Sequence, residues 1–177
     1  RLDSRGGFKR LFTRAPIESL DVGTYLDNVT AKKAYIASIR ADSVRRVSML
    51  WAPDPSILGE GMIETSIKAV KTSWRGKGRI NLVGVALAGF ETLPEQAFGA
   101  VSLRAKRLRG PGAWQPTGLT GEMNTGAVRV LKIIGGNFSA RVTAELSRLI
   151  LIEGSALAPA SILTTADTFK CVVKGGD

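Results

Sequence analysis

The stretch from Met62 to Thr72 reads MIETSIKAVKT and has the periodicity that decides the fold class. Apolar or small residues occupy positions 63, 65, 67 and 69, and Glu64, Ser66 and Lys68 stand between them. Successive side chains of a β-strand point to opposite faces, so this alternation predicts a strand with one buried face and one solvated face.

Short apolar segments separated by turn residues continue on both sides of this stretch, and few of them have a helical period. The segment Ile80–Leu87 is almost entirely apolar, which predicts a central strand buried on both faces. Residues 109–126 hold five glycines and two prolines without periodicity and are expected to form a long surface loop. No internal repeat is apparent. Further strands are expected at Ala34–Ala41, Arg45–Trp51, Ala100–Lys106, Ala127–Ile134, Ala140–Ile152 and Phe169–Lys174.

About eight strands in one chain of 177 residues predict an all-β, single-domain protein. The simplest closure for such a set is a single jelly-roll β-sandwich of antiparallel strands. We expect this domain to span residues 31–177. Residues 1–30 are expected to form a basic N-terminal arm and the segment that leads into the domain, because five cations face a single acid, Asp3, over the first 14 residues.

The composition argues for binding rather than catalysis. The net charge of +10, from 25 basic and 15 acidic residues, predicts polyanionic partners. Histidine is absent, which excludes Ser-His-Asp and Cys-His catalysis and the commonest metal ligand. Cys171 is the single cysteine, so no intrachain disulfide can form and a reducing compartment is expected. We therefore expect no enzyme, catalytic residue, metal or cofactor, and the apolar runs are too short to predict a membrane span.

Clusters of cations are the candidate binding residues, with Trp74 and Trp114 among them. Arginine and lysine near an aromatic ring suit phosphate contact with some base stacking, as in the binding of single-stranded RNA. The low aromatic content favours sequence-tolerant binding led by phosphate contacts. The alternative is that the tryptophans belong to the core and the cations are merely hydrated. The predicted RNA-binding residues are Arg1, Arg5, Lys9, Arg10, Arg14, Lys68, Lys71, Arg75, Lys77, Arg79, Arg104, Lys106, Arg107 and Arg109, and a smaller cluster is Arg40, Arg45 and Arg46.

Short motifs at Leu87-Ala88-Gly89, Leu93-Pro94, residues 99–103 and Lys106-Arg107 resemble the centre of the plant-virus thirty-kilodalton movement-protein superfamily. That resemblance implies a single jelly roll of the kind also found in coat proteins of small icosahedral plant RNA viruses. Ala105 stands where the family has an aspartate before its basic pair, and the chain ends directly after its last expected strand. Both departures favour a coat protein over a movement protein.

Three functions are therefore weighed. The first is a viral coat protein that assembles into a closed homo-oligomeric shell and binds genomic RNA by charge, located in the virion and the host cytoplasm. The second is a movement protein that coats single-stranded RNA for transport between cells. The third is a cellular RNA-binding module.

Overall fold

The computed structural model describes residues 1–51, 63–69, 78–92, 97–107, 114–156, 160–163 and 170–174. Of these described residues 83% are in strands, and none is in a helix. The all-β prediction is therefore confirmed. The strands are β1 (Leu2–Ser4), β2 (Leu11–Thr13), β3 (Ile17–Lys32), β4 (Ile36–Leu50), β5 (Glu64–Ala69), β6 (Gly78–Val83), β7 (Ala86–Thr92), β8 (Ala97–Arg104), β9 (Lys106–Arg107), β10 (Trp114–Gln115), β11 (Gly118–Phe138), β12 (Arg141–Ala156), β13 (Ser161–Leu163) and β14 (Lys170–Lys174).

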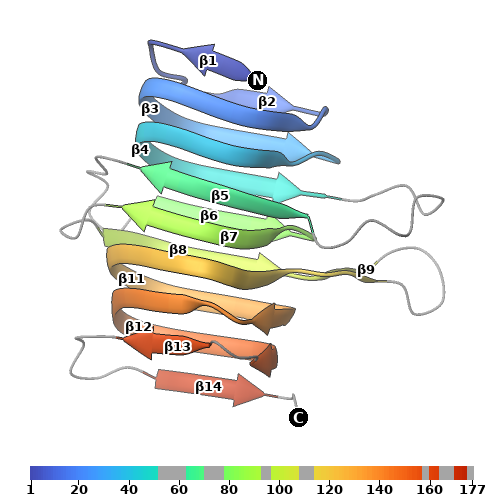
Figure 1. Ribbon diagram of the computed structural model, residues 1–177, viewed down its shortest axis with the longest axis vertical. Coiled ribbons are helices and arrows are strands. Elements are labelled where there is room, and N and C mark those ends of the chain that lie inside the picture. The colour runs from blue at the N-terminus through green and yellow to red at the C-terminus, as the bar shows by residue number, and fades with distance from the viewer. Residues whose placement is uncertain are drawn as a thin grey trace.

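The architecture is a parallel β-solenoid of about six turns, with an incomplete turn at each end. Each turn contributes one strand to a first layer, ordered β1-β3-β4-β5-β7-β11-β12-β13, and one to a second layer, ordered β2-β3-β4-β6-β8-β11-β12-β14. The long strands β3, β4, β11 and β12 pass through both layers. Figure 1 shows the turns stacked along the long axis, with the N-terminus and C-terminus at opposite ends.

The jelly-roll prediction is wrong, because every strand pair of the solenoid body is parallel. The antiparallel exception among the described strands is the small pair β9–β10. Backbone contacts between the described strands join strands of neighbouring turns, so each turn is supported by the turn before it and the turn after it.

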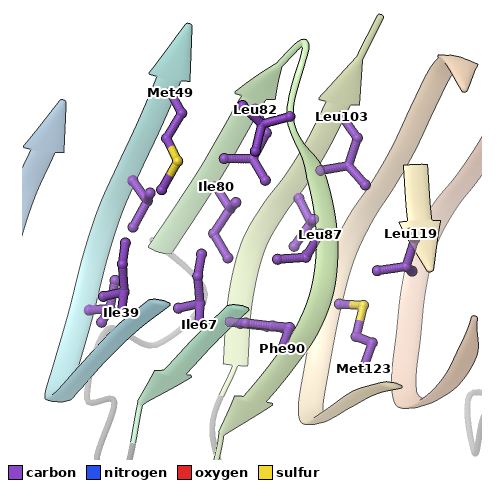
Figure 2. Packing of buried hydrophobic residues seen from close by; sticks show 14 of the residues in the cluster. Ile39, Met49, Ile67, Ile80, Leu82, Leu87, Phe90, Leu103, Leu119 and Met123 are labelled. Atoms are coloured by element: carbon purple, nitrogen blue, oxygen red, sulfur yellow. The ribbon is translucent and has the colours of Figure 1, made fainter. Parts of the chain in front are cut away.

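Apolar side chains stack in columns between the two layers. In the first layer the paired residues Ile39, Ile67, Phe90 and Met123 form a row along the solenoid axis, as Figure 2 shows. The side chain of each is at most 1% exposed. Leu2 and Leu20 extend this column at one end, and Val142 and Ile162 extend it at the other. A matching column in the second layer consists of Leu11, Val29, Val47, Ile80, Val101, Leu131, Ile150 and Cys171, where Cys171 is exposed on the last turn.

Buried threonines connect neighbouring turns inside the solenoid. The hydroxyl of Thr65 donates to the Ile36 carbonyl at 2.6 Å, and the hydroxyls of Thr92 and Thr125 share a hydrogen bond of 2.6 Å. Buried polar groups destabilise a fold unless they find a partner, and these partners lie one turn away. The threonines therefore add turn-to-turn contacts without disrupting the apolar columns.

One corner of the solenoid uses left-handed backbone in several turns. Lys33, Gly84 and Gly135 have φ values of 57°, 68° and 65°, and each directly follows the last second-layer residue of its turn. Glycine adopts this conformation without steric cost, whereas a lysine is strained there. The conformation of this corner therefore favours glycine, but the second turn has Lys33 there.

Replacing Lys33 with glycine is expected to raise the free energy of unfolding by about 0.5–1 kcal/mol, the relief of steric strain less the added freedom of the unfolded chain. Thermal unfolding followed by circular dichroism should show a rise in Tm of roughly 1–4 °C. Lys32→Gly is the matched control, because Lys32 is exposed in extended backbone, where glycine weakens a strand. Equal Tm values for the two variants would contradict the strain at Lys33.

Several expected elements differ from those observed. The single strand expected at Ile80–Leu87 is two strands, β6 and β7, because the chain turns at Gly84 and changes layer. The surface loop expected over residues 109–126 contains β10 and the start of β11. The expected N-terminal arm is not free, because β1 and β2 pair in parallel with β3, and the boundary expected at residue 30 falls inside β3.

Candidate polyanion-binding face

The outer face of the second layer carries cations on most of its turns. Its outward side chains form three columns of paired residues running along the solenoid axis. Glu153 is the single carboxylate in these columns, and it lies 3.9 Å from the Lys174 ammonium. The columns are Asn28-Arg46-Arg79-Ala100-Val130-Leu149-Lys170, Thr30-Ser48-Asn81-Ser102-Lys132-Leu151-Val172 and Lys32-Leu50-Val83-Arg104-Ile134-Glu153-Lys174.

Four arginines of this face surround a hollow of about 800 Å³ that we call the arginine hollow. Arg45 and Arg46 come from β4, Arg79 from β6 and Arg129 from β11. None of the described residues that line it is acidic. The remaining lining residues are Ile80, Asn81, Gly99, Ala100, Ser102 and Val130.

The hollow exists because small residues lie between long ones. Arg46 pairs with Arg79, which pairs with Ala100, so two long side chains are followed by a single methyl group in the same column. Gly99 beside Ala100 adds no side chain, and a register shift in β11 between Val128 and Val130 accommodates Arg129 on the far side. Neighbouring strands are about 4.8 Å apart. The small residues Gly99 and Ala100 therefore leave a gap with arginine side chains on both sides of it.

The charges around the hollow are poorly balanced. Arg45 lies 3.4 Å from a carboxylate oxygen of Asp27, and its side chain remains 39% exposed. Among the ion pairs between described residues, none involves Arg46, Arg79 or Arg129. Stacking Arg46 directly on Arg79 brings like charges together, and an anion placed between them would relieve that repulsion.

The first layer is different in charge. The Lys68 ammonium lies 2.8 Å from a carboxylate oxygen of Glu91, which neutralises it within the sheet. A hollow of about 510 Å³ on this face is lined by Arg40 and Lys68 but also by Glu91 and Glu122. Two cations and two carboxylates balance each other there, so this hollow has no excess charge to attract a polyanion.

The predicted N-terminal cations lie on the first, incomplete turn. Arg1 forms an ion pair of 2.8 Å with Asp3, whose hydrogen bond and charge raise the pKa of Arg1 above its ordinary value. Arg14 lies over the ring of Phe12, at 5.6 Å from the ring centre. Arg5, Lys9 and Arg10 are exposed on the same turn. None of the five N-terminal cations lines the arginine hollow.

The two larger predicted clusters are divided by the fold. Lys68 faces out from the first layer, whereas Arg79 faces out from the second and lines the hollow. Arg104 is exposed on the second layer, and Lys106 and Arg107 form β9. The other predicted residues, Lys71, Arg75, Lys77 and Arg109, lie outside the described residues, as does Trp74.

Of the four arginines that line the hollow, only Arg79 is among the predicted RNA-binding residues. Arg45 and Arg46 belong to the smaller cluster that was not included among the binding residues, and their neighbour Arg40 faces out from the first layer. Arg129 was not singled out at all. It is the exposed residue between Val128 and Val130 in a predicted strand, so the alternation pattern contains a signal for its outward position.

Within the described part of the chain, no helix is long and apolar enough to cross a membrane. No group of three or more cysteine, aspartate or glutamate side chains is placed there to hold a metal ion.

Comparison with known proteins gives no relative. No protein-family model, curated protein or solved structure matches this chain significantly.

Proposed function

We propose that this protein binds single-stranded RNA through phosphate contacts on its second layer, with the arginine hollow as the strongest contact. The observation that carries this proposal is a hollow whose described lining contains four arginines and no acid. The net charge of +10 adds long-range attraction for a polyanion.

The chemistry of the hollow favours phosphate over base recognition. Guanidinium groups bind phosphate oxygens through two parallel hydrogen bonds, and Asn81 and Ser102 add neutral donors in the neighbouring column. Among the described residues that line the hollow none is aromatic, so the contacts seen there suit phosphates rather than stacked bases. Binding is therefore expected to tolerate any RNA sequence.

The test is neutralisation of the two stacked arginines. Arg46→Gln with Arg79→Gln keeps long polar side chains but removes two charges, so the affinity for a labelled 20-nucleotide oligouridylate should fall about tenfold or more at 100 mM salt. The slope of log K against log salt should become shallower by about 1.4, since each lost phosphate contact removes about 0.7. Fluorescence anisotropy between 50 and 200 mM KCl measures both quantities.

Arg40→Gln with Lys68→Gln is the matched control, because it removes the same net charge from the first layer. This control should change the affinity by less than about threefold. Equal losses for the two double variants would show that net charge, and not the arginine hollow, governs binding. No measurable RNA binding by the unmodified protein would reject the proposal outright.

RNA binding is common to all three functions weighed from the sequence. The coat-protein and movement-protein roles, the closed shell and the location in a virion stay predictions. They depended on a jelly roll, which the solenoid replaces. RNA binding through phosphate contacts depends only on the cationic face, so it can be proposed without the jelly roll.

A further inference from the structure

The outer face of the second layer changes character after the arginine hollow. Val130, Leu149, Leu151 and Val172 point outward on the last turns and form one contiguous patch, which we call the apolar patch. Val130 pairs with Leu149 in one column, and Leu151 pairs with Val172 in the next. All four are half-buried, although outward positions of a solvated sheet normally hold polar residues.

Lysines flank this patch in register. Lys132 pairs with Leu151 from the preceding turn, and Lys170 pairs with Leu149 from the following turn. Each leucine of the pair therefore has a cation directly beside it along the solenoid axis. Long lysine side chains can lie along an apolar surface while their ammonium groups reach into a layer of anionic groups.

We propose that the apolar patch and its flanking lysines dock the protein on an anionic lipid bilayer surface. Apolar side chains that enter the headgroup region, with cations that meet lipid phosphates, are the two components of reversible binding at such a surface. This docking centres on Leu149, Leu151 and Val172 of the last turns, whereas RNA is assigned to the arginine hollow, which the patch meets at Val130. The inference does not depend on the RNA proposal.

The backbone of the patch is suited to a bilayer interface. Residues 149–151 are paired on one side with residues 130–132 and on the other with residues 170–172. The amide and carbonyl groups of these three residues are therefore engaged within the solenoid, so lowering Leu149 and Leu151 into the headgroup region dehydrates no unpaired backbone group of their own strand. The strand pairing thus removes the main cost of placing a β-sheet at such an interface.

Charge favours a bilayer over a second copy of the chain. Two second layers packed face to face would bring Lys132, Lys170 and Arg129 of one copy towards the same cations of the other. Glu153 is the single acid in the outward columns, and it already lies near Lys174. Such a dimer would desolvate many like charges, whereas an anionic bilayer satisfies the lysines and covers the leucines together.

Cosedimentation with vesicles tests the docking. The unmodified protein should bind vesicles of phosphatidylcholine with 30% phosphatidylglycerol and should not bind pure phosphatidylcholine. Leu149→Thr with Leu151→Thr introduces β-branched residues that suit a strand but removes the apolar contact, and the bound fraction should fall at least about fivefold. The affinity of this variant for oligouridylate should stay within about twofold of the unmodified protein, because the arginine hollow is intact.

Leu163→Thr is the matched control, since Leu163 is 69% exposed but belongs to the first layer. It should leave vesicle binding unchanged. A second variant, Lys132→Gln with Lys170→Gln, leaves the leucines in place and should weaken binding to the anionic vesicles by roughly 25-fold, about fivefold for each cation.

Equal vesicle binding by the unmodified protein and the leucine variant would overturn the inference. Equal binding to neutral and anionic vesicles would also overturn it. A protein that binds no vesicles but forms a dimer that the leucine variant loses, measured by light scattering, would assign the patch to a second copy. RNA affinity is measured separately, so failure of either proposal leaves the other distinguishable.

Discussion

Replacing Gly121 with alanine is expected to lower the Tm by about 10 °C or more, the largest effect expected of a glycine-to-alanine change among the described residues. Gly121 lies at a register shift between β7 and β11, where a Cβ atom would collide with the carbonyl oxygen of Ala88. That oxygen is backbone and cannot rotate away, so the two strands would have to separate. The expected loss in the free energy of unfolding is about 4 kcal/mol.

Gly89→Ala provides the control on the neighbouring strand of the same layer. A Cβ atom there would lie 3.8 Å from the Ser66 Cβ and 3.9 Å from the Glu122 carbonyl oxygen, which are ordinary contacts. Its Tm should stay within about 2 °C of the unmodified protein. Circular dichroism during heating measures both variants, and similar melting of the two would contradict the close approach of β7 and β11 at Gly121.

Phe90→Ala is expected to reduce the free energy of unfolding by about 3–5 kcal/mol. Phe90 is 1% exposed and lies between Ile67 and Met123 in the first-layer column, so its removal leaves a cavity bounded by two turns that cannot close without breaking strand pairing. Urea unfolding followed by tryptophan fluorescence should show an earlier midpoint.

Phe12→Ala tests whether this cost belongs to the column rather than to the loss of a ring. Phe12 is 56% exposed and contacts Arg14, so its loss should cost less than about 1 kcal/mol. A midpoint shift for Phe90→Ala as small as that for Phe12→Ala would contradict the stacked column as the source of stability.

Alternation in the sequence predicted some of the strands but could not predict how they pair. In β5, Thr65, Ile67 and Ala69 are buried while Glu64 and Lys68 are exposed, as the sequence indicated. The same alternation would arise in a sandwich of antiparallel strands, because side chains point to opposite faces in either arrangement. The choice between parallel and antiparallel pairing depends on connections that carry no periodic signal.

The solenoid repeat escaped notice because its length varies. Leu20 pairs with Ile39, and Met123 pairs with Val142, nineteen residues apart in both cases. Between these regular turns, Ile39 pairs with Ile67 and Phe90 pairs with Met123 across longer segments that interrupt the period. The column residues also change between leucine, isoleucine, phenylalanine and methionine, so no repeated motif remains in the letters.

The arginine hollow could not be found by looking for runs of charge. Arg46 and Arg79 are distant in sequence but directly paired, whereas Lys68 and Arg79, which are close in sequence, face opposite sides of the solenoid. The reason is that β5 belongs to the first layer and β6 to the second. Clusters in a solenoid are therefore set by position within a turn, and the sequence reveals them only after the turns are aligned.

Because each turn is supported only by its neighbouring turns, the number of turns can change without changing the structure of the others. A duplicated turn would extend the shaft by about 4.8 Å and add one more residue to each outer column, without altering its width or the shape of either end. The reach of the cationic surface along a bound strand could thus be adjusted in fixed increments during evolution or by design. The number of turns, rather than the shape of a single turn, therefore sets the length of that surface.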